Sequence, residues 1–237
     1  MTEILGKISS EESMGLVDGP GIRYVVFLQG CKLRCAYCHN PETWSLTGEN
    51  YTISPQKLVE KISRYKAYFG GGGGVTFSGG EPLLQPEFLV ECLKLCKQQN
   101  IHTVLDTSGV GFGEYDQILE LVDLVILDVK ATDENDYKNL TGQNISHFYK
   151  FLDCCQKHNK NLWLRQVIVP GINDTKQNVI NLKNFAKNIK NVQKIELLPY
   201  KTFGNIKYQN LKITERLKGV PEMDEKKCKK LEKLLKD

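Results

Sequence analysis

Residues 30–40 read Gly30-Cys31-Lys32-Leu33-Arg34-Cys35-Ala36-Tyr37-Cys38-His39-Asn40 and bring three cysteines into one short run. Thiolates are soft ligands that favour iron–sulfur clusters, zinc or cuprous ions. A cubane cluster has four irons, so three cysteines leave one iron without a protein ligand. A structural metal site closes that position, whereas a catalytic site keeps it open for a substrate. The run therefore predicts a reactive iron–sulfur cluster.

Two other metal sites match part of this run. Cys35-Ala36-Tyr37-Cys38-His39 has the spacing of a haem-attachment motif, and His39 could complete a zinc site with the three cysteines. Haem attachment belongs to exported proteins, and the N-terminal residues lack the apolar segment of a signal peptide. Because nothing marks the chain for export, we expect a cytoplasmic protein without disulfides. Judged on the cysteines alone, a zinc site remains an alternative to the cluster.

The composition is that of an ordinary globular protein. The chain has 237 residues, a net charge of +4, 41% hydrophobic and 25% charged residues. No apolar run approaches the roughly 20 residues that span a bilayer. Lysines between residues 226 and 236 supply much of the positive charge, and a solvated helix face explains them better than nucleic-acid binding. The length suits one domain, residues 1–237, with no membrane or nucleic-acid partner.

Five further cysteines are predicted to pack in the core rather than to bind metal. Each lies beside apolar residues at helical spacing, as a small buried hydrophobe would. They are Cys92, Cys96, Cys154, Cys155 and Cys228.

Short β-branched runs alternate with amphipathic stretches along the whole chain. The expected strands are 22–28, 75–78, 103–106, 124–128, 162–169 and 194–198. The expected helices are 55–69, one opening at Pro86, 115–121, 146–158, 178–189 and 222–235. Strands that are separated by helices and buried on both faces predict a parallel sheet. Six units are too few for a closed eight-stranded barrel, so we expect an α/β fold of the incomplete (β/α)6 barrel type.

Polar motifs follow the carboxyl ends of these strands, which form one rim in parallel α/β folds. Gly79-Gly80 lets backbone approach a ligand, and Glu81 is an acceptor suited to an ammonium group. Asp106 and Asp128 end consecutive strands, so their carboxylates are expected in one cavity. Two like charges there would raise one pKa unless a cation, or Lys130 and Arg165, balanced them.

These motifs together resemble the glycyl-radical-enzyme activases of the radical S-adenosylmethionine (SAM) superfamily. The resemblance covers essentially the whole chain. It rests on the pattern Gly19-x-Gly21-x-Arg23-x-x-x-Phe27-x-x-Gly30-Cys31-x-x-x-Cys35-x-Tyr37-Cys38-x-Asn40, followed by Gly79-Gly80-Glu81.

The resemblance implies a [4Fe-4S] cluster on Cys31, Cys35 and Cys38, with SAM chelating the fourth iron. Lys130 and Arg165 would be the charged residues of the catalytic centre. A monovalent cation would be held by Asp106, Thr107 and Asp128. The residues that it assigns to SAM are Tyr37, Cys38, His39, Asn40, Gly79, Gly80, Glu81, Asp128, Val129, Lys130 and Lys201.

Position 201 departs from the family pattern. After Leu197-Leu198-Pro199-Tyr200 the family places a histidine that touches SAM, and this sequence has Lys201. A lysine can donate a hydrogen bond there, but it adds charge beside a sulfonium cation.

The resemblance also implies the reaction and its partners. One electron from the reduced cluster would cleave SAM, and the resulting radical would take a hydrogen from a glycine of pyruvate formate-lyase. A flavodoxin or ferredoxin would donate the electron. Asp18, which precedes the first strand, is expected to contact the target's glycine loop at the cavity mouth. Another glycyl-radical enzyme, or a small-molecule substrate, is the alternative.

Overall fold

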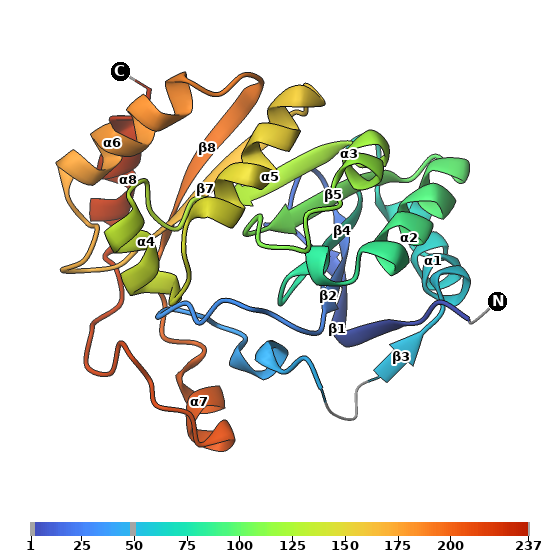
Figure 1. Ribbon diagram of the computed structural model, residues 1–237, viewed down its shortest axis with the longest axis horizontal. Helices are drawn as coiled ribbons and strands as arrows, with labels where there is room; N and C mark the ends of the chain where they lie inside the picture. The colour runs from blue at the N-terminus through green and yellow to red at the C-terminus, as the bar shows by residue number, and fades with distance from the viewer. Residues whose placement is uncertain (1–2, 48–50, 237) are drawn as a thin grey trace.

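Eight strands form one sheet in the computed structural model, which describes residues 3–47 and 51–236 (Figure 1). The strand order is β3-β1-β2-β4-β5-β6-β7-β8. The strands are β1 (Gly6–Gly15), β2 (Arg23–Leu28), β3 (Tyr51–Ile53), β4 (Gly74–Gly79), β5 (His102–Thr107), β6 (Leu124–Asp128), β7 (Leu162–Ile168) and β8 (Val192–Pro199). Neighbours among the last six strands of this order are all parallel; these strands are β2, β4, β5, β6, β7 and β8.

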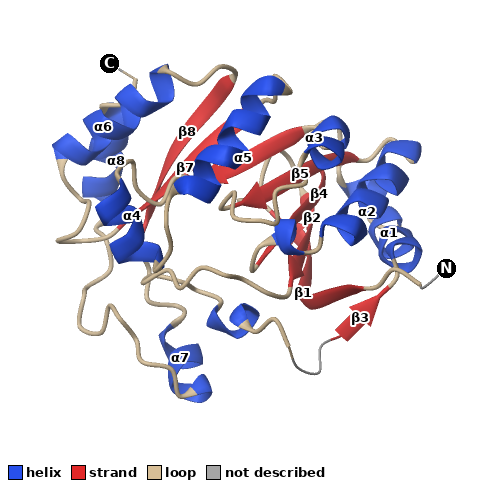
Figure 2. Ribbon diagram, viewed as in Figure 1, coloured by secondary structure: helices blue, strands red, loops and turns tan. Residues whose placement is uncertain are grey.

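The parallel strands are in register, so their carboxyl ends share one edge. Leu28 at the end of β2 pairs with Gly79 at the end of β4, and Asp128 at the end of β6 pairs with Arg165. β3 and β8 lie at the two ends of the strand order, so the sheet does not close, as Figure 2 shows. The expectation of an incomplete barrel of parallel strands is confirmed.

Four of the helices begin directly after a capping residue. Ser54, Asp133, Thr175 and Asp224 each cap a helix by accepting a hydrogen bond from a backbone N–H three residues on. The helices are α1 (Pro55–Ser63), α2 (Pro86–Gln98), α3 (Asp116–Leu121), α4 (Glu134–Thr141), α5 (Ser146–Lys157), α6 (Lys176–Lys187), α7 (Asn205–Leu211) and α8 (Glu225–Lys233). Short 3-10 helices cover Pro41–Trp44, Lys66–Tyr68 and Pro82–Leu84.

The main core lies between the sheet and the helices that cover its outer side (Figure 1). Cys92, Cys96, Cys155 and Cys228 are buried in it, as expected. Cys154 is only half-buried: it packs against the edge of this core, and its Sγ faces Asp116.

Four elements and one helix end differ from the sequence prediction. β1, β3, α4 and α7 were not expected, and the helix expected through residue 69 ends at Ser63. β1 is antiparallel and exposes alternate polar residues, so it lacks the apolar run of the inner strands. α4 buries only Tyr137, Leu140 and Thr141, which is too little periodicity to identify a helix.

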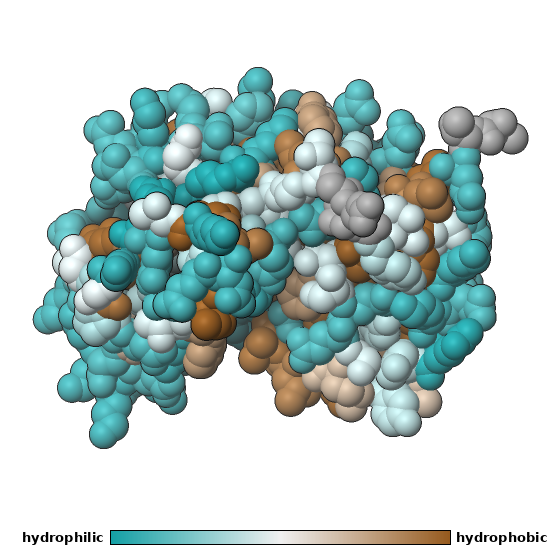
Figure 3. Space-filling view, turned by 90° about the horizontal axis from the view of Figure 1, so that it is seen from below, coloured by the Kyte–Doolittle hydropathy of each residue, from teal (hydrophilic) through white to brown (hydrophobic). Residues whose placement is uncertain are grey.

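Among the described residues, no helix is long and apolar enough to cross a membrane. Figure 3 shows a face on which hydrophilic residues predominate and apolar ones form separate patches.

Candidate active site

The cysteine run follows β2 and is held by the carboxyl end of α4. The backbone N–H groups of Arg34 and Ala36 donate to the carbonyls of Thr141 and Leu140, each at 2.8 Å. The last carbonyls of a helix have no partner within it and need donors from elsewhere. The cysteine loop supplies these donors, so α4 fixes the loop's backbone.

Two residues from the chain's C-terminal part hold the same loop. The Arg216 guanidinium donates to the carbonyls of Arg34, at 2.9 Å, and Leu140, at 3.2 Å. The Tyr208 hydroxyl of α7 donates to the carbonyl of Cys38 at 3.0 Å. Segments about 180 residues apart in the sequence therefore meet at the cysteines.

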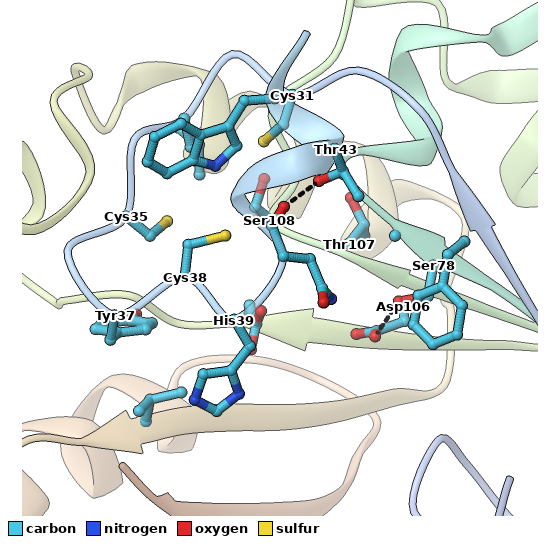
Figure 4. Close-up of a pocket in the computed structure, with 18 of the residues that line it drawn as sticks. Cys31, Cys35, Tyr37, Cys38, His39, Thr43, Ser78, Asp106, Thr107 and Ser108 are labelled. Atoms are coloured by element: carbon cyan, nitrogen blue, oxygen red, sulfur yellow. Dashed lines mark hydrogen bonds between the residues drawn. The ribbon is translucent and has the colours of Figure 1, made fainter. Parts of the chain in front are cut away.

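The three cysteines surround one cavity of about 270 Å³ at the carboxyl edge of the sheet. Figure 4 shows the sulfurs of Cys31, Cys35 and Cys38 turned toward the same hollow. Burial raises the pKa of all three thiols, that of Cys35 to about 11. Metal binding must therefore displace their protons.

The described side chains around the three cysteines are not gathered as the ligands of a single zinc ion would be. Zinc bonds of about 2.3 Å in a tetrahedron would bring the sulfurs to about 3.8 Å from one another. Among the described residues, the three sulfurs do not all lie within 4.8 Å of one another. The Nε2 atom of His39, the fourth ligand of the zinc alternative, lies 2.8 Å from the carbonyl of Lys201. Three thiols around one cavity suit a [4Fe-4S] cubane with one iron left for a ligand.

Most of the predicted site residues lie around this cavity. Those that line it are Asp18, Cys31, Cys35, Tyr37, Cys38, His39, Asn40, Gly79, Gly80, Asp106, Thr107, Asp128 and Lys130. Those that do not line it are Glu81, Val129, Arg165 and Lys201.

Glu81 points into the protein instead of the cavity. Its carboxylate accepts hydrogen bonds from the Thr107 hydroxyl, from the backbone and hydroxyl of Ser108, and from the backbone N–H of Leu83. Burial raises its pKa, and these hydrogen bonds oppose that effect. The side chain therefore joins the loop after β4 to the loop after β5, which leaves no oxygen facing an ammonium group.

The acidic pair lies as the sequence predicted. Asp106 and Asp128 line the same cavity, and the Ser78 hydroxyl donates to Asp106 at 2.7 Å. Burial raises the pKa of Asp106 to about 6; the negative charge of Asp128 adds to this and Arg165 opposes it. Lys130 Nζ lies 2.6 Å from Asp128, and this carboxylate outweighs burial and holds the pKa of Lys130 above its usual value. Lys130 thus stays charged.

Arg165 acts on the loop formed by residues 16–22. Its Nε atom pairs with Glu196 at 2.9 Å, and its Nη2 atom donates to the carbonyl of Val17. The Thr76 hydroxyl donates to the carbonyl of Asp18 at 2.7 Å. These bonds hold the 16–22 loop against the sheet, and Asp18 lines the cavity wall.

Lys201 and Val129 meet the site through their backbones. The Lys201 ammonium pairs with Glu225 at 2.8 Å and with Glu222 at 3.6 Å, while its carbonyl contacts His39. The Val129 side chain is fully buried in the core, and its N–H donates to the carbonyl of Arg165. Neither side chain faces the cavity.

Seven lining residues were not assigned to the site from the sequence. They are Phe27, Leu33, Thr43, Trp44, Ser78, Ser108 and Val167. Two of them had a signal, because Pro41 directly after the cysteine run opens the 3-10 helix that carries Thr43 and Trp44. The others are ordinary strand or loop residues whose direction depends on the fold.

Comparisons with known proteins agree with this geometry. The model of the radical SAM superfamily matches residues 25–182. The pyruvate formate-lyase-activating enzyme of Clostridium pasteurianum is 53% identical over 99% of this chain and 98% of its own, and that of Staphylococcus epidermidis is 41% identical over 94% and 92%.

A solved structure gives the same result. The crystal structure of a domain of pyruvate-formate lyase-activating enzyme from Bacteroides vulgatus matches with a TM-score of 0.56 and 25% identity. The match covers 70% of this chain and 94% of that domain. The three cysteines around one cavity, the open parallel sheet and these similarities lead to one conclusion: the chain belongs to the pyruvate formate-lyase-activating enzymes of the radical SAM superfamily.

Proposed function

We propose that this chain activates pyruvate formate-lyase by placing a radical on one of its glycines. When bound, the [4Fe-4S] cluster supplies the electron that cleaves SAM into methionine and a 5′-deoxyadenosyl radical, and this radical takes a hydrogen atom from the glycine. The observation that carries the proposal is the arrangement of Cys31, Cys35 and Cys38, whose sulfurs face one cavity beside Gly79 and Gly80. The described strands form one sheet, and its main core takes residues from every strand and from every α-helix except α7, which supports one domain.

The chain's own residues bind and orient the reactants. Tyr37, Cys38, His39 and Asn40 would lie along the adenosyl part of SAM. Gly79 and Gly80 line the cavity and would offer their backbone to the methionine part. A Cβ on Gly80 would lie 2.3 Å from the carbonyl oxygen of Gly30, so only glycine lets this backbone pack against the loop that leads into the cysteines.

Charge in the cavity would hold the rest of SAM and a cation. The charged Lys130 suits the carboxylate and ribose side, with Val129 giving only backbone. Asp106 and Asp128 are two carboxylates in one cavity, which supports a monovalent cation there. The Thr107 hydroxyl donates its proton to Glu81 and accepts from the backbone N–H of Gly109, which leaves one lone pair of its oxygen for that cation.

Asp18 and the 16–22 loop would meet the target's glycine loop. Leu16 and Val17 expose 72% and 76% of their surface beside the cavity, which supports contact with a second protein. Arg165 and Glu196 would position this loop rather than react. The electron donor would be a flavodoxin or ferredoxin, and the protein would act in the cytoplasm.

The test is anaerobic reconstitution with iron, sulfide, SAM and pyruvate formate-lyase, read by electron paramagnetic resonance. We expect a glycyl-radical signal with the wild type and with Cys92→Ala, a buried cysteine outside the cavity, and none with Cys35→Ala. SAM cleavage without a radical on pyruvate formate-lyase would point to another glycyl-radical enzyme or a small-molecule substrate. Loss of the cluster in Cys92→Ala but not in Cys35→Ala would refute the ligand assignment.

The Asp18 assignment has its own test. Asp18→Asn should lower the yield of glycyl radical far more than it weakens SAM binding, while Glu12→Gln, the same change in charge nearby, should alter neither. An equal loss of SAM affinity and radical yield would instead place Asp18 in the SAM site.

A further inference from the structure

We propose that Asp116, Cys154 and His158 form a second metal site, for a zinc-class divalent ion, which ties α3 to α5. The site is separate from the cavity of Cys31, Cys35 and Cys38, since none of its three residues lines that cavity. It is independent of the proposed reaction.

The three ligand atoms are already gathered. They all lie within 4.8 Å of one another: Asp116 Oδ1 is 2.7 Å from His158 Nε2, and the Cys154 Sγ is 3.5 Å from the same oxygen. Cys154 and His158 are four residues apart at the end of α5, so one helix turn stacks them on one face. In the described part of the chain, this is the one group of three such side chains that meets this spacing.

The donor set suits zinc rather than a hard cation. Zinc takes thiolate, imidazole and carboxylate ligands together, whereas Mg²⁺ and Ca²⁺ prefer oxygen alone. A thiolate and a carboxylate would balance the two positive charges of the ion, and water would fill the fourth position. Binding releases the thiol proton of Cys154, because only the thiolate is a ligand.

The surroundings also favour a cation. His158 caps the carboxyl end of α5, where the helix dipole attracts positive charge. His158 keeps 21% of its side chain exposed and Asp116 keeps 77%, so an ion can enter from solvent. The site is therefore open on one side and built on two helices.

An ion here would brace one wall of the active-site cavity. Asp116 is the first residue of α3, directly after the loop that carries Ser108 of the cavity wall. The ring of Tyr115, its neighbour, packs against Phe151 of α5 at 5.0 Å. A metal bond between Asp116 and α5 would add a second tie at the same junction.

The test uses the cluster-loaded protein, so that Cys31, Cys35 and Cys38 are occupied. The holoprotein is dialysed without oxygen against Zn²⁺, bound zinc is counted by mass spectrometry, and its ligands are read from X-ray absorption at the zinc edge. We expect one zinc per chain, with one sulfur and otherwise nitrogen or oxygen neighbours. Cys154→Ser and His158→Gln should each weaken zinc binding at least about tenfold. Asp116→Asn should weaken it as well, and because this side chain is exposed, the variant should fold even if the other two do not.

His147→Gln and Asp153→Asn are matched controls, because both positions are exposed on α5 and neither belongs to the trio. They should leave zinc binding unchanged. Three outcomes would overturn the proposal: no zinc bound by the wild type, a shell of three sulfurs (zinc in the cluster site), or equal binding by Cys154→Ser.

Discussion

At the scale of single residues, the buried carboxylate of Glu81 links two loops of the cavity rim. It accepts hydrogen bonds from Thr107, Ser108 and Leu83 and has no exposure to solvent. Glu81→Gln keeps the shape of the side chain but replaces one accepting oxygen by an NH2 group, which cannot accept a hydrogen bond from these donors. We expect the free energy of unfolding of the cluster-free protein to fall by about 2 kcal/mol. Urea denaturation measures this, with exposed Glu87→Gln as the control that should change little.

Tyr137 is the opposite case, a buried hydroxyl with no hydrogen-bond partner in the described structure. Tyr137→Phe removes only that oxygen, so the cluster-free protein should keep its stability or gain up to about 1 kcal/mol. Tyr24→Phe is the comparison, since the hydroxyl of Tyr24 donates to Glu11 and its loss should destabilise the protein. Equal losses in the two variants by urea denaturation would mean that Tyr137 has a partner after all.

At the scale of elements, α4 and the cysteine loop depend on each other. Arg216 bridges them, because it donates to carbonyls of both Arg34 and Leu140. Arg216→Ala removes charge-assisted hydrogen bonds that are worth about 1.5 kcal/mol, so the amides of Arg34 and Ala36 should exchange with solvent about tenfold faster. Hydrogen exchange in the cluster-free protein measures this. Lys218→Ala, an exposed neighbour, should leave both amides protected.

The elements differ in how clearly the sequence predicts them. Five of the six parallel strands are mostly buried, so their apolar patterns are clear, whereas the edge strand β8 buries only Leu197. β1 alternates buried and exposed residues with serines and glutamates between them, and α4 buries three side chains only. Their places depend on pairing with β2 and with the cysteine loop, which no local pattern encodes.

For the site, spacing predicted which residues gather but not where each side chain points. The strand ends brought Asp106, Asp128 and Lys130 together, since parallel register places them at one edge. Glu81 and Lys201 also follow strand ends, yet one turns into the core and the other pairs with Glu225. The partners that decide their direction, Ser108 and Glu225, are distant in the sequence, so only the fold reveals them.

At the scale of the whole molecule, the sheet is open, and the segment after β8 crosses to the cysteine loop. Gly204, just before α7, packs on that loop: an added Cβ would lie 3.0 Å from the Cys38 carbonyl oxygen and 3.0 Å from the His39 Cα. Tyr208 bonds the same carbonyl, and Lys207 Nζ lies 2.8 Å from Asn40 Oδ1. The C-terminal part thereby holds the rim where no strand closes the barrel.

This arrangement predicts that Gly204→Ala weakens the cluster site from a distance in the sequence. The methyl group would push against the backbone of Cys38 and His39, so the cysteine sulfurs would be held less firmly. We expect the loaded variant to lose iron to a chelator several-fold faster than the wild type, because contacts this tight require the loop to shift. Gly71→Ala is the matched control, since a Cβ there meets nothing within 4 Å. The release of iron is measured by the bleaching of cluster absorbance. If both variants release iron at the wild-type rate, then the segment after β8 does not support the cysteine loop.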